Sequence, residues 1–375
     1  MERAGIYVHI PFCRAKCPYC DFFSLPQKEP PWRDYLDALK QELLLRKEDL
    51  TGLSFQTLYV GGGTPSLFPP HFYEEWLDFL AKHLDLELKE RTIEVNPEGL
   101  SLGSLKALRR IFNRLSIGAQ SFSEKGLNTL RRRHNVEDIL KVIDWASEAS
   151  FENISLDLIF AWPGQTLKDL EDELKKIFSL PVVHLSFYEL TIEPGTPFYS
   201  LYEKGALQKP SEEDITQMFL LLWERTKAAG FGHYEVSNYA RPGYQCAHNI
   251  LYWTSAPFVG FGPGAASFLH QVRRKNKEDL QAYLEALKEK RRPPEELDVL
   301  DPEARFREAI VLGLRLVQGV RRSAFKKRFG FDLAQYYGPL LAKLASQGLV
   351  SWDGENLKLT PHGRLLANFV ARELI

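Results

Sequence analysis

Three of the four cysteines in this chain lie close together near its start. Cys13, Cys17 and Cys20 form the pattern C-x3-C-x2-C within the stretch HIPFCRAKCPYCDFFS at 9–24. In a reducing compartment, such a cluster more often binds metal or carries out chemistry than forms disulfides. The spacing therefore predicts a metal centre or a reactive thiol site.

Three structures could explain the cysteine spacing. A buried stripe on a helix is disfavoured because Pro11 and Pro18 interrupt a regular helix. A structural zinc site needs a fourth ligand, for which His9 is the nearest candidate, and no second pair of ligands follows at zinc-finger spacing. A four-iron cluster fits better, since three thiolates leave one iron without a protein ligand.

Tyr19, directly before the last cysteine, makes the motif more specific. The pattern resembles that of the radical S-adenosylmethionine superfamily. The resemblance implies a [4Fe–4S] cluster held by Cys13, Cys17 and Cys20. The amino and carboxylate groups of S-adenosylmethionine would occupy the open iron. In that superfamily an electron from the cluster cleaves the sulfonium C–S bond and yields a 5′-deoxyadenosyl radical.

A glycine-rich stretch, TLYVGGGTPS, lacks the Lys-Ser/Thr of a P-loop and is not a dinucleotide G-x-G-x-x-G. It resembles the superfamily loop that binds the methionine ammonium, and GGGTP resembles the oxygen-independent coproporphyrinogen III oxidase branch. Carboxylates suit ribose hydroxyls, and a guanidinium suits the methionine carboxylate. The resemblance assigns to the cofactor pocket Tyr7, Tyr19, Gly62, Gly63, Thr64, Glu94, Gln120, Arg132 and Asp157.

Within this branch, oxidative decarboxylation of coproporphyrinogen competes with haem binding and delivery by haem chaperones. The related oxidases have a further cysteine where this chain has Phe22, and an N-terminal extension that we do not expect here. HNILYW at 248–253 matches H-N-x-x-Y-W, which is characteristic of the haem chaperones. The resemblance favours a haem chaperone that binds S-adenosylmethionine, with cleavage left open, and that lacks coproporphyrinogen oxidase activity.

The motif supplies candidate contacts for haem. His248 is the candidate axial ligand of the iron, and Asn249, Tyr252 and Trp253 complete the motif, the two aromatic residues suiting porphyrin. Cys246 could be a fourth cluster ligand, a haem thiolate or a small buried hydrophobe, and the last is preferred. The glycine-rich stretch 259–268 could admit a flat ligand or be a plain loop.

The elements that must position these residues follow from the apolar pattern. Strands are expected at 5–10, 57–62, 92–97, 114–120, 154–160 and 184–190, with helices at 32–47, 136–149 and 211–228 between or after them. Alternating strands and helices predict an α/β fold with a parallel sheet, whose carboxyl-end loops share one site.

The resemblance and the pattern together divide the chain into three parts. A partial (β/α)6 radical S-adenosylmethionine barrel is expected at 1–205, and a linking region with the H-N-x-x-Y-W motif at 206–298, ending in a proline-containing linker at 289–298. A helical, winged-helix-like domain is expected at 299–375, where a hairpin signal surrounds DGEN.

Composition restricts the partners and the location. The chain of 375 residues has 48 basic and 49 acidic residues, which argues against a polyelectrolyte partner for the whole molecule. The basic C-terminal part makes nucleic-acid binding a third, less favoured function.

No apolar run approaches the roughly 18 residues of a membrane span, and no signal peptide is evident. We expect a cytoplasmic protein, with peripheral membrane docking left open. Expected partners are haem and haem-accepting proteins such as respiratory cytochromes or oxidases, while a haem donor and a homodimer remain open.

Overall fold

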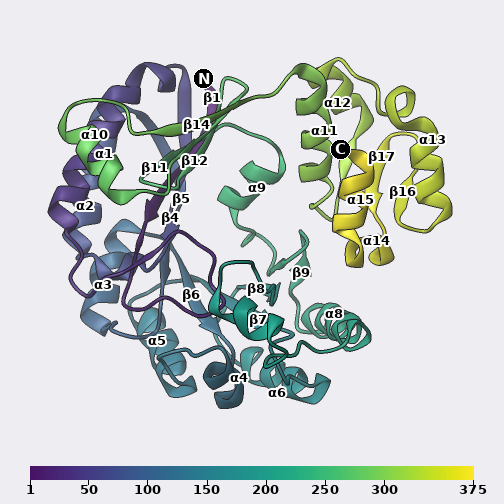
Figure 1. The fold of residues 1–375 in the computed structure, drawn as a ribbon, viewed down its shortest axis with the longest axis horizontal. Coiled ribbons are helices and arrows are strands. Elements are labelled where there is room, and N and C mark those ends of the chain that lie inside the picture. The colour runs from purple at the N-terminus through teal and green to yellow at the C-terminus, as the bar shows by residue number, and fades with distance from the viewer.

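A curved sheet of twelve strands forms the centre of the computed structural model, which describes residues 1–375 (Figure 1). Six neighbouring strands run parallel, and a helix lies between each strand and the next. The expected α/β class with parallel strands is confirmed. The six are β1 (Glu2–Ile10), β4 (Leu53–Gly62), β5 (Asp85–Val95), β6 (Arg114–Gln120), β7 (Asn153–Phe160) and β8 (His184–Glu189).

Helices cover the outer face of this sheet (Figure 1). Three of them begin with a capping box. In this motif the side chain of the capping residue accepts from the backbone N–H of the third helical residue, whose side chain accepts from the backbone N–H of the capping residue. The capping residues are Ser101, Asn135 and Thr166. The helices between and after the parallel strands are α1 (Trp32–Arg46), α2 (Pro70–His83), α3 (Leu102–Ile111), α4 (Glu124–Thr129), α5 (Val136–Glu148), α6 (Leu167–Ile177), α7 (Pro197–Glu203) and α8 (Glu212–Ala228), with 3-10 turns η1 (Lys47–Leu50) and η2 (Pro65–Leu67).

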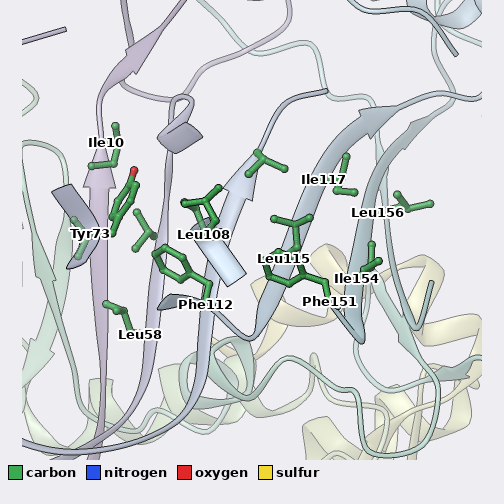
Figure 2. Close-up of a cluster of buried hydrophobic side chains, with 14 of the residues drawn as sticks. Ile10, Leu58, Tyr73, Leu108, Phe112, Leu115, Ile117, Phe151, Ile154 and Leu156 are labelled. Atoms are coloured by element: carbon green, nitrogen blue, oxygen red, sulfur yellow. The ribbon is translucent and has the colours of Figure 1, made fainter. Parts of the chain in front are cut away.

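Alternation along the strands gives the sheet an apolar outer face and a polar inner face. On β6, Leu115 and Ile117 belong to the same buried cluster as Leu108 and Phe112 from the end of α3 (Figure 2). The intervening Ser116 lies on the opposite face. Polar residues at such inner-face positions are Tyr7, His9, Thr57, Tyr59, Glu94, Ser116, Asp157, His184 and Ser186.

The segment after α8 widens the sheet at both edges. On one side β11 (Phe258–Phe261) pairs parallel with β1, followed by antiparallel β12 (Ala266–Leu269), β13 (Val272–Asn276) and β14 (Glu295–Val299). On the other side lie β10 (Asn238–Ala240) and β9 (Gly232–His233). The linker expected at 289–298 is therefore wrong in its second half, where pairing with β13 makes a strand.

Two helices of this segment pack in different places. α10 (Leu280–Lys288) packs against α1, whereas α9 (Ala247–Trp253) contacts β1 and β4 and lies on the inner side of the curved sheet (Figure 1). A small parallel pair, β2 (Phe12–Cys13) and β3 (Leu25–Pro26), encloses the remaining cysteine loop. The glycine-rich stretch 259–268 is a strand, a turn and a strand rather than a plain loop.

The C-terminal part has helices and a hairpin where they were expected. It contains α11 (Pro302–Gly313), β15 (Val320–Arg321), α12 (Arg322–Phe329), α13 (Leu333–Ser346), β16 (Val350–Trp352), β17 (Asn356–Leu359), α14 (Pro361–Leu365) and α15 (Ala367–Leu374). These elements enclose a buried apolar cluster of their own. None of the helices in the molecule combines the length and the hydropathy needed to span a bilayer.

The basic helix α12 uses its charges within the chain. Arg322 and Lys326 both lie within ion-pair distance of Asp332, at 3.0 and 3.4 Å. Arg328 donates to the carbonyl oxygens of Thr254 and Ser255, just beyond α9. Three of the four basic residues of the helix therefore have partners within the chain.

Candidate functional site

The three clustered cysteines lie on one loop at the carboxyl end of β1. All three are half-buried and none is in a disulfide. The loop turns between Cys17 and Cys20, where the Cys20 N–H donates to the Cys17 carbonyl over 3.1 Å. Three thiols on one turn, with no fourth cysteine among them, fit a four-iron cluster that keeps one iron open.

The geometry of His9 disfavours the zinc alternative. Its Nδ1 lies 3.0 Å from the Tyr7 hydroxyl, and its Nε2 lies 2.8 Å from the Phe23 carbonyl oxygen. A zinc ligand needs a free nitrogen lone pair. Because both ring nitrogens of His9 are occupied, it offers no fourth ligand in this arrangement.

Arg132 connects the cysteine loop to the next strands. Its Nη1 donates to Cys17 Sγ over 3.1 Å and lies 3.4 Å from the Tyr19 hydroxyl, and its Nη2 donates to Asn96 Oδ1 over 2.7 Å. The guanidinium Nε is buried without a partner. A half-buried cation with a spare donor beside a thiol cluster can bind a carboxylate.

The glycine-rich loop packs directly against the cysteine loop. Gly62 has a φ of +109°, and a Cβ there would lie 2.6 Å from the His9 ring. A Cβ on Gly63 would lie 2.5 Å from the Phe12 carbonyl oxygen. The Thr64 hydroxyl donates to Cys13 Sγ over 3.5 Å. Only glycines allow the two loops to approach this closely.

Two carboxylates lie deeper on the inner face of the sheet. Glu94 accepts from the Tyr59 hydroxyl at 2.7 Å and from the Gly62 N–H at 3.1 Å, and Asp157 accepts from Ser116 at 2.8 Å. Burial, together with the nearby charge of Asp157, raises the pKa of Glu94 to about 7. Burial also raises the pKa of Asp157. Paired acids in this setting can accept hydrogen bonds from hydroxyl groups of a ligand.

The predicted cofactor residues therefore gather on the inner face and at the carboxyl ends of neighbouring strands. Gln120 has a φ of 66° where β6 shifts register, and a Cβ on Gly118 would lie 3.0 Å from its side-chain nitrogen and 2.9 Å from Asn96 Oδ1. The sequence reasoning missed Asn96, Tyr59 and Ser116. Asn96 directly follows β5, which was the available signal, whereas the other two are ordinary strand residues whose role depends on their partners.

His248 lies in the interior rather than on an open surface. Its Nδ1 is 2.7 Å from the Thr57 hydroxyl and its Nε2 is 2.8 Å from the Tyr252 hydroxyl. Burial lowers the pKa of His248 to about 3, so the ring is neutral. A haem iron could reach either nitrogen only after one of these bonds had broken.

The N-terminal end of α9 explains the surroundings of Cys246. Glu90 accepts from the N–H groups of Ala247 and His248, each over 2.9 Å. Cys246 is buried, with its sulfur 3.6 Å from a Glu90 oxygen, and burial raises the pKa of its thiol. This environment suits a small buried side chain. Asn249, next on the helix, is half-buried.

A cavity of about 540 Å³ lies between α9, which carries the motif, and the sheet. Its size lies in the range of ligand sites in proteins. Tyr7 and His9 line the part next to the predicted cofactor pocket, and Glu308 and Leu312 of α11 line another part. Aromatic walls come from Phe22, Phe23, Tyr252, Trp253, Phe258 and Phe268, and charged residues from Asp21, Arg273, Lys275, Glu278 and Glu308.

Comparisons with known proteins agree with this geometry. The family model of the radical SAM superfamily matches residues 7–177, and that of the HemN C-terminal domain matches residues 300–366. The solved structure of coproporphyrinogen III oxidase (HemN) from Escherichia coli superposes with a TM-score of 0.86, over 100% of this chain and 90% of that one. At 24% identity this likeness shows the fold. Fold and cysteine site together define a radical SAM protein with a HemN-type C-terminal region.

Sequence relatives narrow the class. Heme chaperone HemW from Bacillus subtilis is 35% identical over 367 residues, covering 97% of each chain. Heme chaperone HemW from Escherichia coli is 32% identical, covering 97% of this chain and 96% of its own. That from Mycobacterium tuberculosis strain H37Rv is 34% identical, covering 99% and 94%. The chain belongs to the heme chaperone HemW family.

Proposed function

We propose that this protein is a haem chaperone that binds haem in the cavity beside α9 and delivers it to haem-requiring proteins. The observation that carries the proposal is the lining of that cavity, to which the motif residues Tyr252 and Trp253 both contribute. The names of the HemW relatives support the same function. Respiratory cytochromes or oxidases are the recipients that we propose.

The lining of the cavity supports a porphyrin as its ligand. Phe22, in place of the further cysteine of the related oxidases, is 63% exposed and forms part of the wall. The indole N–H of Trp253 is buried without a partner in the protein and can donate to a ligand. Aromatic faces bind the flat apolar ring, and cationic side chains such as Arg273 suit the propionates.

Cys13, Cys17 and Cys20 would hold the [4Fe–4S] cluster, which the radical SAM family implies. Arg132 would bind the carboxylate of S-adenosylmethionine, and Glu94 and Asp157 would accept from its hydroxyl groups. When bound, cluster and cofactor together supply one-electron reduction chemistry. Since Tyr7 and His9 border both the cofactor pocket and the haem cavity, the occupancy of one site can influence the other.

The decisive experiment measures haem binding and oxidase activity on one preparation. The cluster is reconstituted anaerobically, haem is titrated while the Soret band is followed, and coproporphyrinogen decarboxylation is assayed in parallel. We expect tight haem binding, no decarboxylation and weaker binding by Trp253→Leu. The control Trp145→Leu changes a half-buried tryptophan on α5 and should bind haem normally. Decarboxylase turnover without haem binding would contradict the proposal.

A further inference from the structure

We propose that the motif residue that ligates the haem iron is Tyr252, through its hydroxyl oxygen, and that His248 is the residue that positions it. The inference rests on the proposed haem site and identifies the atom that contacts the iron. It replaces the expectation, based on the motif alone, that the imidazole of His248 is the ligand.

Accessibility separates the two residues. Tyr252 is half-buried and lines the cavity, whereas His248 is fully buried and does not line it. The His248 ring is enclosed by Tyr59, which stacks on it with the ring centroids 5.2 Å apart, and by Thr57, which binds its Nδ1. The Tyr252 hydroxyl is therefore more accessible to an iron in the cavity than the His248 imidazole is.

The other strong donors around the cavity are less suitable. His9 has both nitrogens engaged, by Tyr7 and by the Phe23 carbonyl. The Tyr7 hydroxyl also pairs with a histidine, but Tyr7 lies on β1 within the predicted cofactor pocket and near Glu94. Tyr252 instead adjoins Trp253 and packs edge-on against Phe258, with centroids 4.6 Å apart, among the walls that would hold the porphyrin.

The hydrogen-bond chain behind Tyr252 suits a tyrosinate ligand. A neutral imidazole has one N–H and one lone pair. With its proton on Nε2, His248 donates to the Tyr252 oxygen over 2.8 Å and accepts from the Thr57 hydroxyl at Nδ1 over 2.7 Å. This arrangement holds the phenol ring and leaves a lone pair on its oxygen for a metal. It requires no charge on the buried histidine.

Ferric haem can then bind to Tyr252 without an oxidant or a reductant. An Fe–O bond forms, the phenolic O–H bond breaks, and the proton leaves to solvent through the cavity. The iron remains ferric, and the Nε2–H of His248 continues to donate to the phenolate oxygen. Tyrosinate is an established haem ligand in proteins, and hydrogen bonds from neighbouring groups tune such ligands.

The test is spectroscopic and uses the full chain with ferric haem. We expect electron paramagnetic resonance of wild type to show high-spin ferric iron, and resonance Raman to show phenolate ring modes. Tyr252→Phe should lose the phenolate modes and bind haem about tenfold more weakly. His248→Ala should keep a weakened phenolate signature, and His248→Gln should restore part of it because its amide can also donate. Tyr202→Phe, which changes an exposed tyrosine on α7 outside the cavity, is the matched control and should keep the signature.

The outcomes separate this inference from the proposed function. Phenolate modes that persist in Tyr252→Phe, or that vanish in Tyr202→Phe, would overturn the assignment while haem binding stood. A low-spin, imidazole-type spectrum of wild type that disappears in His248→Ala would also overturn it. Failure of wild type to bind haem at all would overturn the proposed function and this assignment together. Circular dichroism and thermal unfolding of each variant identify any that fail to fold.

Discussion

The aromatic ring of Tyr59 stacks on the ring of His248, with centroids 5.2 Å apart, while the Tyr59 hydroxyl donates to Glu94 over 2.7 Å. Tyr59, on β4, thus contacts the predicted cofactor residue Glu94 through its hydroxyl and the motif helix α9 through the face of its ring. This contact connects the predicted cofactor pocket to the helix that carries the motif.

Tyr59→Phe should weaken S-adenosylmethionine binding without changing haem binding. Loss of the hydroxyl removes one hydrogen bond to Glu94 and should weaken S-adenosylmethionine binding about threefold to tenfold, on the usual scale of a single intramolecular hydrogen bond. The retained ring should leave haem affinity unchanged. Isothermal titration with each ligand measures both effects, and Tyr59→Leu, which also loses the stacking, should weaken both. If Tyr59→Phe lost affinity for both ligands equally, the hydroxyl and the ring of Tyr59 would not have separate roles.

Arg132→Lys should weaken S-adenosylmethionine binding by about tenfold or more, since an ammonium cannot reproduce the planar fork that contacts Cys17 and Asn96. Because the cluster thiolates remain, the iron content after reconstitution should not change. Equilibrium dialysis and iron analysis measure the two quantities. Arg133→Lys, on the adjacent exposed residue, is the control and should bind normally. Loss of the cluster itself would contradict the assignment of Arg132 to the cofactor.

Glu94 should make the apoprotein less stable as pH rises. Its pKa is about 7 in the folded state against an ordinary value of 4.5. Between these values the unfolded chain releases the proton first, so the free energy of unfolding falls with rising pH, by up to about 3 kcal/mol. Urea unfolding at pH 5 and pH 8 tests this. Glu94→Gln should be more stable than wild type at pH 8, with a smaller difference at pH 5. A difference independent of pH would refute the shifted pKa.

Arg273 and Glu308 form an ion pair across the cavity, between β13 and α11. A haem propionate would compete with Glu308 for Arg273. Glu308→Gln should therefore raise haem affinity about threefold, and Arg273→Gln should lower it about fivefold, within the range for partly exposed pairs. Arg274→Gln, which affects the adjacent pair with Glu295, should have no effect. With haem dimethyl ester, both differences should disappear, and their persistence would exclude propionate contact.

Phe112→Ala should destabilise the sheet by about 3–5 kcal/mol, because it opens a cavity among fully buried side chains below α3 (Figure 2). Urea unfolding measures the loss. Phe369→Ala is the control, since that ring lies on the C-terminal part and is 43% exposed. It should change stability by less than about 1 kcal/mol. A small effect of Phe112→Ala would mean that the outer-face core relaxes around the gap.

Much of the fold could be predicted from local patterns. Apolar runs located all six parallel strands, since buried parallel strands are apolar along their length and the helices between them are amphipathic. The prediction failed at β14, Glu295–Val299, which has three acidic residues among five, is mostly exposed and becomes a strand only through pairing with β13. Such a strand has no local signal, because the partner's hydrogen bonds define it.

For the site, the sequence by itself determined the residues whose meaning lies in their spacing. The cysteines, the glycine-rich loop and H-N-x-x-Y-W identify the family, because close spacing along the chain forces closeness in space. Only the tertiary structure decided which atoms are available. It paired Arg132 with Cys17 across 115 positions, and Thr57 with His248 across 191. The second contact buries the motif histidine and leaves Tyr252 at the cavity, because burial and hydrogen bonding depend on residues far apart in the chain.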